Sequence, residues 1–189
     1  MRTLTILLPL LTFFWASTVS AHGPVRQKVD EEILINAPAE KVWDLIKDPC
    51  SMKQWHPQVE DCTAEGNQKG ALIKLTLKNG GWINATLKKI DDKKKIFAYK
   101  FNTDDISTTH TIVHANQEIK VPLIPVANFS ASIMVKEEGD SQAKVIWKAA
   151  FYRAYMNNNP PEEMNEEAGI KAVTDFLRSG LENLKKIAQ

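Results

Sequence analysis

Four histidines are the residues of this chain with the most versatile chemistry, since imidazole can bind a metal or transfer a proton. His110 and His114 are four positions apart, which places them on one face of either a helix or a strand. His22 would become the amino terminus if a leader were removed before it, and an amino-terminal histidine can chelate copper. His56 lies in a Trp-His-Pro turn, where a hydrogen-bonded structural role is expected. A metal centre usually needs at least three ligands, so the sequence predicts no metal. It also predicts no cofactor, because the cofactor motifs considered below are missing.

The two cysteines are the next residues with possible chemistry. Eleven residues separate Cys50 from Cys62. In an oxidising compartment such a pair is a candidate for a disulfide, and a loop of this size would stabilise the fold by about 3 kcal/mol. The alternative is two buried free thiols that act as small apolar groups. We favour the disulfide, because a thiol left free after export is chemically vulnerable. A zinc site is not expected without histidines at ligand spacing.

Recognisable catalytic motifs are missing from the sequence. It contains no Gly-x-Ser-x-Gly elbow, phosphate-binding glycine loop, dinucleotide fingerprint, His-Glu-x-x-His pair or Cys-x-x-Cys-His haem attachment. Tyr99, Tyr155 and Arg153 are the side chains that could supply an acid or a base to a cavity. In the strands described below, the side chains that are expected to face the interior are almost entirely apolar. The sequence therefore predicts a protein that is not an enzyme.

The first 21 residues have the pattern of a secretory signal peptide. Arg2 precedes an apolar run from Leu4 to Trp15, and small residues up to Ala21 provide a cleavage site. The apolar run is too short to cross a bilayer. We therefore expect an exported protein that is cleaved after Ala21 and whose residues 22–189 form a single domain.

The charge balance argues against nucleic acid as a partner. The full chain has 24 Lys and Arg against 23 Asp and Glu, a formal net charge of +1. Arg2 is the one charged residue of the leader, so the mature chain has no net charge. A neutral surface lacks the electrostatic footprint of a nucleic-acid-binding protein, and docking to a charged partner would depend on local patches.

Hydrophobic periodicity predicts the elements that must position these residues. Alternation indicates a strand over residues 27–35, and apolar spacing indicates a helix over 38–46 and a shorter helix over 52–55. Between residues 59 and 155 the period becomes two and is broken by turn signals, which is typical of an antiparallel meander. A long amphipathic helix is expected to begin near Pro161 and to run to the end of the chain.

One stretch fits the meander poorly. Residues 102–125 are polar and rich in threonine, and a short strand-like run at 119–121 is flanked by Pro122 and Pro125. We interpret this stretch as a long excursion between two strands, with a structural hairpin as an equal alternative. Excursions of this length within a compact domain are often functional.

The order of elements predicts an α+β protein with a helix-grip fold, in which a curved sheet wraps the last helix. A concave sheet does not pack flat against one helix, so a cavity commonly remains between them. Aromatic and aliphatic residues with inward parity are the candidate lining of a cavity for an apolar ligand: Phe97, Tyr99, Phe101, Trp147, Phe151, Val173, Phe176 and Leu177. The alternative is that these side chains fill the space completely as core.

The first half of the mature chain resembles a known superfamily. Residues 35–44, with the sequence INAPAEKVWD, the Trp55-His56-Pro57 turn and Cys62 are similar to the START-like, or SRPBCC, superfamily in its polyketide cyclase/dehydrase-type branch. This resemblance implies the helix-grip fold, with a curved antiparallel sheet around a long C-terminal helix and two short helices after the first strand.

The second half resembles a narrower family. Residues 151–161 and 180–185, and the leader that ends before His22, are similar to the MxaD-like proteins, which are exported accessory proteins of methanol oxidation in methylotrophic bacteria. The resemblance covers nearly all of the mature chain except residues 102–125. It implies a periplasmic protein that assists methanol dehydrogenase or its electron transfer to cytochrome c.

Two functions remain open at this point, and a cyclase or dehydratase is a less favoured third. One is the accessory role, for which an exposed segment supplies docking candidates: Tyr155, Met156, Asn157, Asn158 and Asn159. The other is a carrier or sensor of an apolar small molecule or lipid. Outward aromatic side chains over residues 152–161 would suit docking, whereas inward ones would suit a ligand pocket.

Overall fold

The computed structural model describes residues 23–189, and the predicted leader and His22 lie outside the described residues. The α-helices and β-strands, with one short 3-10 helix labelled η1, follow in chain order: β1 (Gln27–Ile35), α1 (Ala39–Ile46), α2 (Met52–Trp55), β2 (Val59–Ala64), β3 (Leu72–Leu77), β4 (Trp82–Asp91), β5 (Ile96–Ile106), β6 (Thr108–His114), β7 (Gln117–Pro122), β8 (Val126–Glu137), β9 (Ala143–Arg153), η1 (Glu162–Met164) and α3 (Glu166–Ala188).

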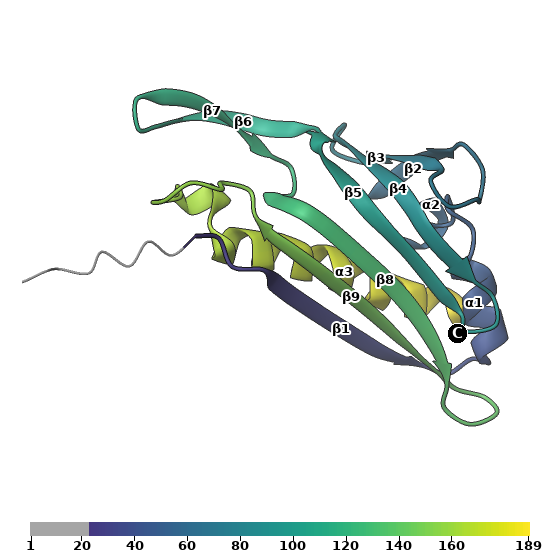
Figure 1. Cartoon of the computed structure of the whole chain (residues 1–189). Helices are drawn as coiled ribbons and strands as arrows, with labels where there is room; N and C mark the ends of the chain where they lie inside the picture. The colour runs from purple at the N-terminus through teal and green to yellow at the C-terminus, as the bar shows by residue number, and fades with distance from the viewer. Residues whose placement is uncertain (1–22) are drawn as a thin grey trace, which may run out of the picture.

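A curved antiparallel sheet of seven strands forms the body of the molecule (Figure 1). The strand order is β1-β9-β8-β5-β4-β3-β2, and α3 lies along the concave side of the sheet. Helix α1 covers one end, and the two-stranded β6–β7 ribbon projects from the opposite end. The structure is therefore the α+β, START-like architecture that the sequence predicts, and this prediction is confirmed.

Alternation places the apolar side chains of the strands on the concave face. Along β9, Val145, Trp147, Ala149 and Phe151 are at most 3% exposed. The residues between them are half-buried or exposed on the convex face. Period-two burial explains why the sheet can cover one helix with its inner face while its outer face stays in solvent.

Helix α3 begins later than the sequence predicts. The prediction placed its start near Pro161, but the backbone of Asn165 is extended, and residues 162–164 form the separate turn η1. The side chain of Asn165 accepts a hydrogen bond of 2.8 Å from the backbone N–H of Ala168. This cap satisfies one of the free donors of the first turn and sets the start of the helix at Glu166.

Residues 102–125 are a hairpin for most of their length, which was the alternative to an irregular excursion. Strand β5 continues to Ile106, and β6 and β7 then pair with each other as a separate ribbon. The turn is made by Ala115 and Asn116, with φ of 50° and 62°. Two successive residues in the left-handed region are the geometry of a tight hairpin turn.

The structure contains a disulfide between Cys50 and Cys62, whose Cα atoms are 5.3 Å apart. Cys50 lies in the connection between α1 and α2, and Cys62 lies on β2. The bond therefore attaches the two short helices to the edge of the sheet.

Candidate functional site

The structure brings the eight predicted cavity residues together between the sheet and α3. Each of them is at most 4% exposed. Their rings contact one another: Trp147 meets Phe176 of α3 with ring centroids 5.8 Å apart, and Phe97 meets Tyr99 at 5.8 Å. Their common location agrees with the parity of the strands, while their role as the lining of a ligand cavity stays a prediction.

Three further aromatic side chains belong to this cluster, although they were not among the predicted lining residues. The ring of Trp55 lies 5.6 Å from that of Trp147. Phe129 of β8 stacks on Phe101 with ring centroids 4.0 Å apart. The rings of His56 and Phe176 have centroids 4.1 Å apart and are tilted by 30°. The parity of β8 could have identified Phe129, whereas the position of His56 depends on a turn that packs beneath the helix.

Two buried polar groups in this cluster are without hydrogen-bond partners among residues 23–189. They are the hydroxyl of Tyr99 and the indole N–H of Trp147, on residues that are 2% and 0% exposed. Burial raises the pKa of the Tyr99 hydroxyl. The indole N–H of Trp147 is near enough to the hydroxyl to oppose this shift in part, although the two groups do not form a hydrogen bond within 3.5 Å. The hydroxyl therefore keeps its proton and remains a donor. Since a buried donor without a partner destabilises a fold, this pair is an unusual feature of an otherwise apolar core.

His56 is also buried, but both of its ring nitrogens are engaged. Nδ1 accepts from the backbone N–H of Gln58 at 3.3 Å, so Nε2 carries the proton and donates to the carbonyl of Phe176 at 3.0 Å. Burial lowers the pKa of His56 to about 4, although the bond to Phe176 acts in the opposite direction. The imidazole is therefore neutral near pH 7 and holds the Trp-His-Pro turn against α3.

The three side chains considered as acid or base lie apart. Tyr99 is in the core, whereas the ring of Tyr155 lies beside His114 of the projecting ribbon, at 5.1 Å. Arg153 donates to the carbonyl of Tyr155 at 2.6 Å and forms an ion pair of 2.5 Å with Glu166. Arg153 thus fastens the chain after β9 to the start of α3, and the three groups do not face one reaction centre.

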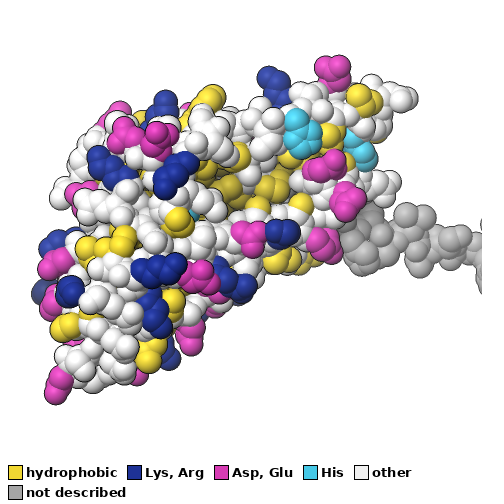
Figure 2. Space-filling model, turned by 180° about the vertical axis from the view of Figure 1, so that it is seen from behind, with side chains coloured by type: hydrophobic (Ala, Val, Ile, Leu, Met, Phe, Trp, Pro, Cys, Tyr) yellow, Lys and Arg dark blue, Asp and Glu magenta, His cyan; other side chains and the backbone are white. Residues whose placement is uncertain are grey.

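The five docking candidates and the ribbon meet at the same end of the molecule. Figure 2 shows histidine side chains at the projecting ribbon, beside a hollow in which hydrophobic side chains are visible. Met156 is 45% exposed, and residues 157–159 are exposed as well. Tyr155 is half-buried against His114, so the two stretches that were singled out as separate irregular surfaces form one surface.

The histidines of the ribbon share a face of β6, as their spacing predicts. His110 is opposite Val121 and His114 is opposite Gln117 in the pairing with β7. Within residues 23–189, no group of three or more His, Cys, Asp or Glu side chains could hold a metal ion.

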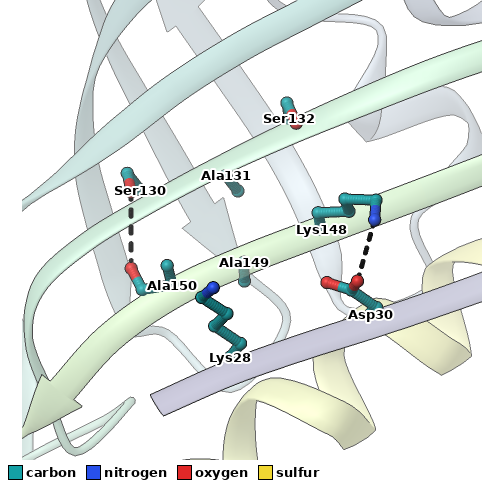
Figure 3. Close-up of a pocket in the computed structure, with 8 residues that line it drawn as sticks. All are labelled: Lys28, Asp30, Ser130, Ala131, Ser132, Lys148, Ala149 and Ala150. Atoms are coloured by element: carbon teal, nitrogen blue, oxygen red, sulfur yellow. Dashed lines mark hydrogen bonds and ion pairs between the residues drawn. The ribbon is translucent and has the colours of Figure 1, made fainter. Parts of the chain in front are cut away.

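A hollow of about 430 Å³ lies on the convex face of the sheet (Figure 3). Short side chains of β8 and β9, among them Ser130 and Ala150, form its floor. At its side, the Lys148 amine and the Asp30 carboxylate form an ion pair of 2.9 Å. The charges of this pair neutralise each other, and Lys28 is the remaining charged residue among those that line the hollow.

Comparisons with known proteins agree with the fold. Residues 26–189 match the model of a family described as polyketide cyclase/dehydrase and lipid transport. No curated protein is significantly similar to the chain in sequence.

Among the helices of residues 23–189, none combines the length and the apolar character that a bilayer crossing needs.

Three solved structures illustrate the similarity. The protein XoxI from Bacillus cereus is 22% identical over 85% of this chain and 94% of its own, with a TM-score of 0.65. The Zhui aromatase/cyclase from a Streptomyces species is 13% identical over 87% and 94%, with a TM-score of 0.61. A START superfamily protein from Mycobacterium smegmatis is 11% identical over 85% and 96%, with a TM-score of 0.59. At these identities the likeness concerns the fold alone.

Proposed function

The chain belongs to the polyketide cyclase/dehydrase and lipid transport family, and from that premise we propose that it binds an apolar small molecule beneath α3 without transforming it. The ligand carries an oxygen that accepts hydrogen bonds. It lies among the aromatic side chains of the concave face, and the protein acts as its carrier or sensor.

The unpartnered donors of Tyr99 and Trp147 carry this proposal. A carbonyl or hydroxyl oxygen placed between them would accept from both, and would thereby remove the cost of two unsatisfied buried groups. The surrounding aromatic rings would bury the rest of the ligand. Ligand sites are commonly of this kind, with apolar walls and a few placed polar groups.

The arrangement of the polar groups supports binding rather than catalysis. A cyclase or dehydratase needs an acid or base directed at the reacting atoms. Tyr99 stays protonated because burial raises its pKa, and neutral His56 has both ring nitrogens bonded to the backbone. Tyr155 and Arg153 are at the ribbon end of the molecule.

The test replaces Tyr99 with Phe, which removes the hydroxyl and keeps the ring. The probe is prodan, a neutral fluorescent naphthyl ketone whose carbonyl is a hydrogen-bond acceptor. We expect prodan to bind the unaltered protein and the Tyr99→Phe variant to bind it about fivefold more weakly, since one hydrogen bond contributes about 1 kcal/mol. Without prodan, the variant should be more stable than the parent, because an unsatisfied buried group has been removed.

Two outcomes would contradict the proposal. One is the absence of prodan binding to the unaltered protein. The other is equal affinity in the Tyr99→Phe and Trp147→Phe variants and in the parent. Native mass spectrometry of the protein from its own host supplies an independent check, because a retained small molecule would add a discrete mass.

The surface formed by the ribbon and residues 155–159 favours a second function. We propose that the exported chain is an MxaD-like accessory protein that assists methanol dehydrogenase or its electron transfer to cytochrome c in the periplasm. The contact of His114 with Tyr155 supports this, because it joins the two candidate docking stretches into one projecting surface. Projecting loops and exposed apolar side chains are common features of docking surfaces.

Cytochrome reduction measures this second role directly. The protein is added to methanol dehydrogenase and its cytochrome acceptor, and the rate is followed over a range of ionic strength. We expect a changed rate that is sensitive to salt, because a chain cleaved after Ala21 would have no net charge and would dock through local charged patches. An unchanged rate at every ionic strength, with no detectable complex, would contradict the accessory role and leave the ligand-binding proposal untouched.

A further inference from the structure

The sheet divides between β5 and β8. These strands pair only over residues 96–100 of β5 and 130–134 of β8, and the last pair is Lys100 with Ser130. Beyond this pair, β5 stays with β4 and β8 stays with β9. Both outer ladders are irregular here, and Asn128 of β8 has a φ of 50°. We call this divergence the fork.

A hollow of about 550 Å³ occupies the fork. Phe101 and Phe129 are among its lining residues and stack on each other at 4.0 Å. Behind them, the ring of Tyr99 lies 5.6 Å from Phe101 and 6.2 Å from Phe129. One stacked pair of rings thus separates the fork from the side chain that carries an unpartnered buried hydroxyl.

The rim of the hollow carries three basic side chains from different parts of the sheet. Lys88 comes from β4, Lys100 from β5, and Arg26 from the residue before β1. Arg26 donates to Ser130 Oγ at 3.2 Å, which places its guanidinium at the closed end of the fork. Across the described part of the chain, neither lysine has a carboxylate within 4.0 Å of its amine.

Two acidic residues line the same hollow and limit where an anion could bind. Asp104 and Asp105 are farther along β5 than Lys100, toward the open end of the fork. Asp105 accepts a hydrogen bond of 2.7 Å from the Asn84 side chain, so one of its oxygens is directed toward β4. The positive charges are therefore concentrated where the strands separate, and the negative charges lie beyond them.

We propose that the ligand of the aromatic core is an amphipathic anion that enters through the fork. Its apolar body passes the rings of Phe101 and Phe129, and its carboxylate, sulfonate or phosphate group stays at Arg26, Lys88 and Lys100. This inference rests on the proposed ligand-binding function and adds the chemical class of the ligand. The physical reason is that an anion gains charge-assisted hydrogen bonds at unpaired amines, whereas the rings behind them favour an apolar body.

Two dyes of similar size separate the head group from the apolar body. Anilinonaphthalene sulfonate is anionic, and prodan is neutral. In the Lys100→Gln variant we expect about tenfold weaker binding of the anionic dye and unchanged binding of prodan, because one charge-assisted contact is lost. The Lys88→Gln/Lys100→Gln double variant should weaken binding of the anionic dye further. Added salt should weaken binding of the anionic dye and leave binding of prodan unchanged.

The matched control is Lys148→Gln on the same convex face. Lys148 is already paired with Asp30, as Figure 3 shows, so its replacement removes a positive charge without removing an unpaired amine. This control should leave the affinity of both dyes unchanged. A loss equal to that of Lys100→Gln would overturn the inference, because it would indicate general attraction to a basic face.

The remaining outcomes distinguish this inference from the function on which it rests. In one result, prodan binds the protein while Lys100→Gln leaves the affinity for the anionic dye unchanged. This result would overturn the anionic class of ligand and keep the ligand-binding function. Failure of both dyes to bind the unaltered protein would overturn both proposals together.

Discussion

The two ends of the sheet are built in different ways. At the α1 end, β5, β8, β9 and β1 pair without a break, and Trp43 and Ile46 of α1 are at most 2% exposed beneath them. At the ribbon end, β5 and β8 separate, and Val113 and Met156 are 74% and 45% exposed. Continuous pairing and burial supply stability at the first end, whereas the second end leaves strand edges and apolar side chains exposed.

The largest expected effect is on the free energy of unfolding, when a buried and an exposed tryptophan are each replaced by alanine. Trp147 is fully buried in the core, and we expect Trp147→Ala to lower the free energy of unfolding by about 3–5 kcal/mol. Trp82 is 41% exposed at the ribbon end, and Trp82→Ala should cost less than about 1 kcal/mol. Chemical denaturation of both variants measures the two values. Equal losses would show that stability is not concentrated in the core.

Acid should weaken the protein through His56. The unfolded chain binds a proton at this residue below its ordinary pKa of 6.5, whereas the folded protein binds it only near its pKa of about 4. The free energy of unfolding should therefore fall by about 3 kcal/mol as the pH drops through this window. A His56→Gln variant should show a flatter dependence between pH 6.5 and 4. Identical pH profiles for the parent and His56→Gln would disprove the assignment.

Two glycines on α3 allow a smaller and more local comparison. A Cβ atom at Gly180 would lie 2.6 Å from Cδ2 of His56 and 2.8 Å from Cζ3 of Trp147. Gly180→Ala should cost about 1–3 kcal/mol, because these packed rings have little room to move. At Gly169 the nearest atoms would be 3.3 Å away, and alanine also favours the helix by about 1 kcal/mol. Thermal unfolding should therefore show the greater loss for Gly180→Ala, and the reverse order would contradict the packing.

The smallest effect is expected at the tip of the ribbon. Val113 contributes little to packing, and Val113→Ser should change the free energy of unfolding by less than about 0.5 kcal/mol. Denaturant unfolding tests this expectation, with the buried Val145→Ser variant as the control that should lose much more. A large loss for Val113→Ser would mean that the ribbon packs against the body more tightly than its exposure indicates.

Much of the fold could be predicted because its signals are local. The strand over residues 27–35 and the short helix over 52–55 have the predicted bounds, since alternation and apolar spacing are visible within a few residues. The start of α3 was missed because Pro161 was a stronger signal than Asn165, whose capping side chain sets the boundary. The hairpin remained undecided because its turn is Ala-Asn rather than the usual Asn-Gly or Asp-Gly.

The burial of the candidate lining residues could be predicted from the sequence, whereas the state of their polar groups could not. Parity was enough to place Tyr99 and Trp147 on the concave face, because side-chain direction in a strand depends only on neighbouring positions. That their polar atoms lack partners depends on every element packed around them, and no local pattern contains this information.

The sequence by itself determined the succession of elements and the inward or outward direction of their side chains, because both depend on short-range periodicity. Only the tertiary structure decided where β5 and β8 separate, and which side chains meet there. Lys100 and Ser130 are neighbours through strand pairing alone, and Arg26 reaches the same place from the position just before the first strand. Contacts between such distant positions depend on the register and curvature of the whole sheet, which no segment specifies alone.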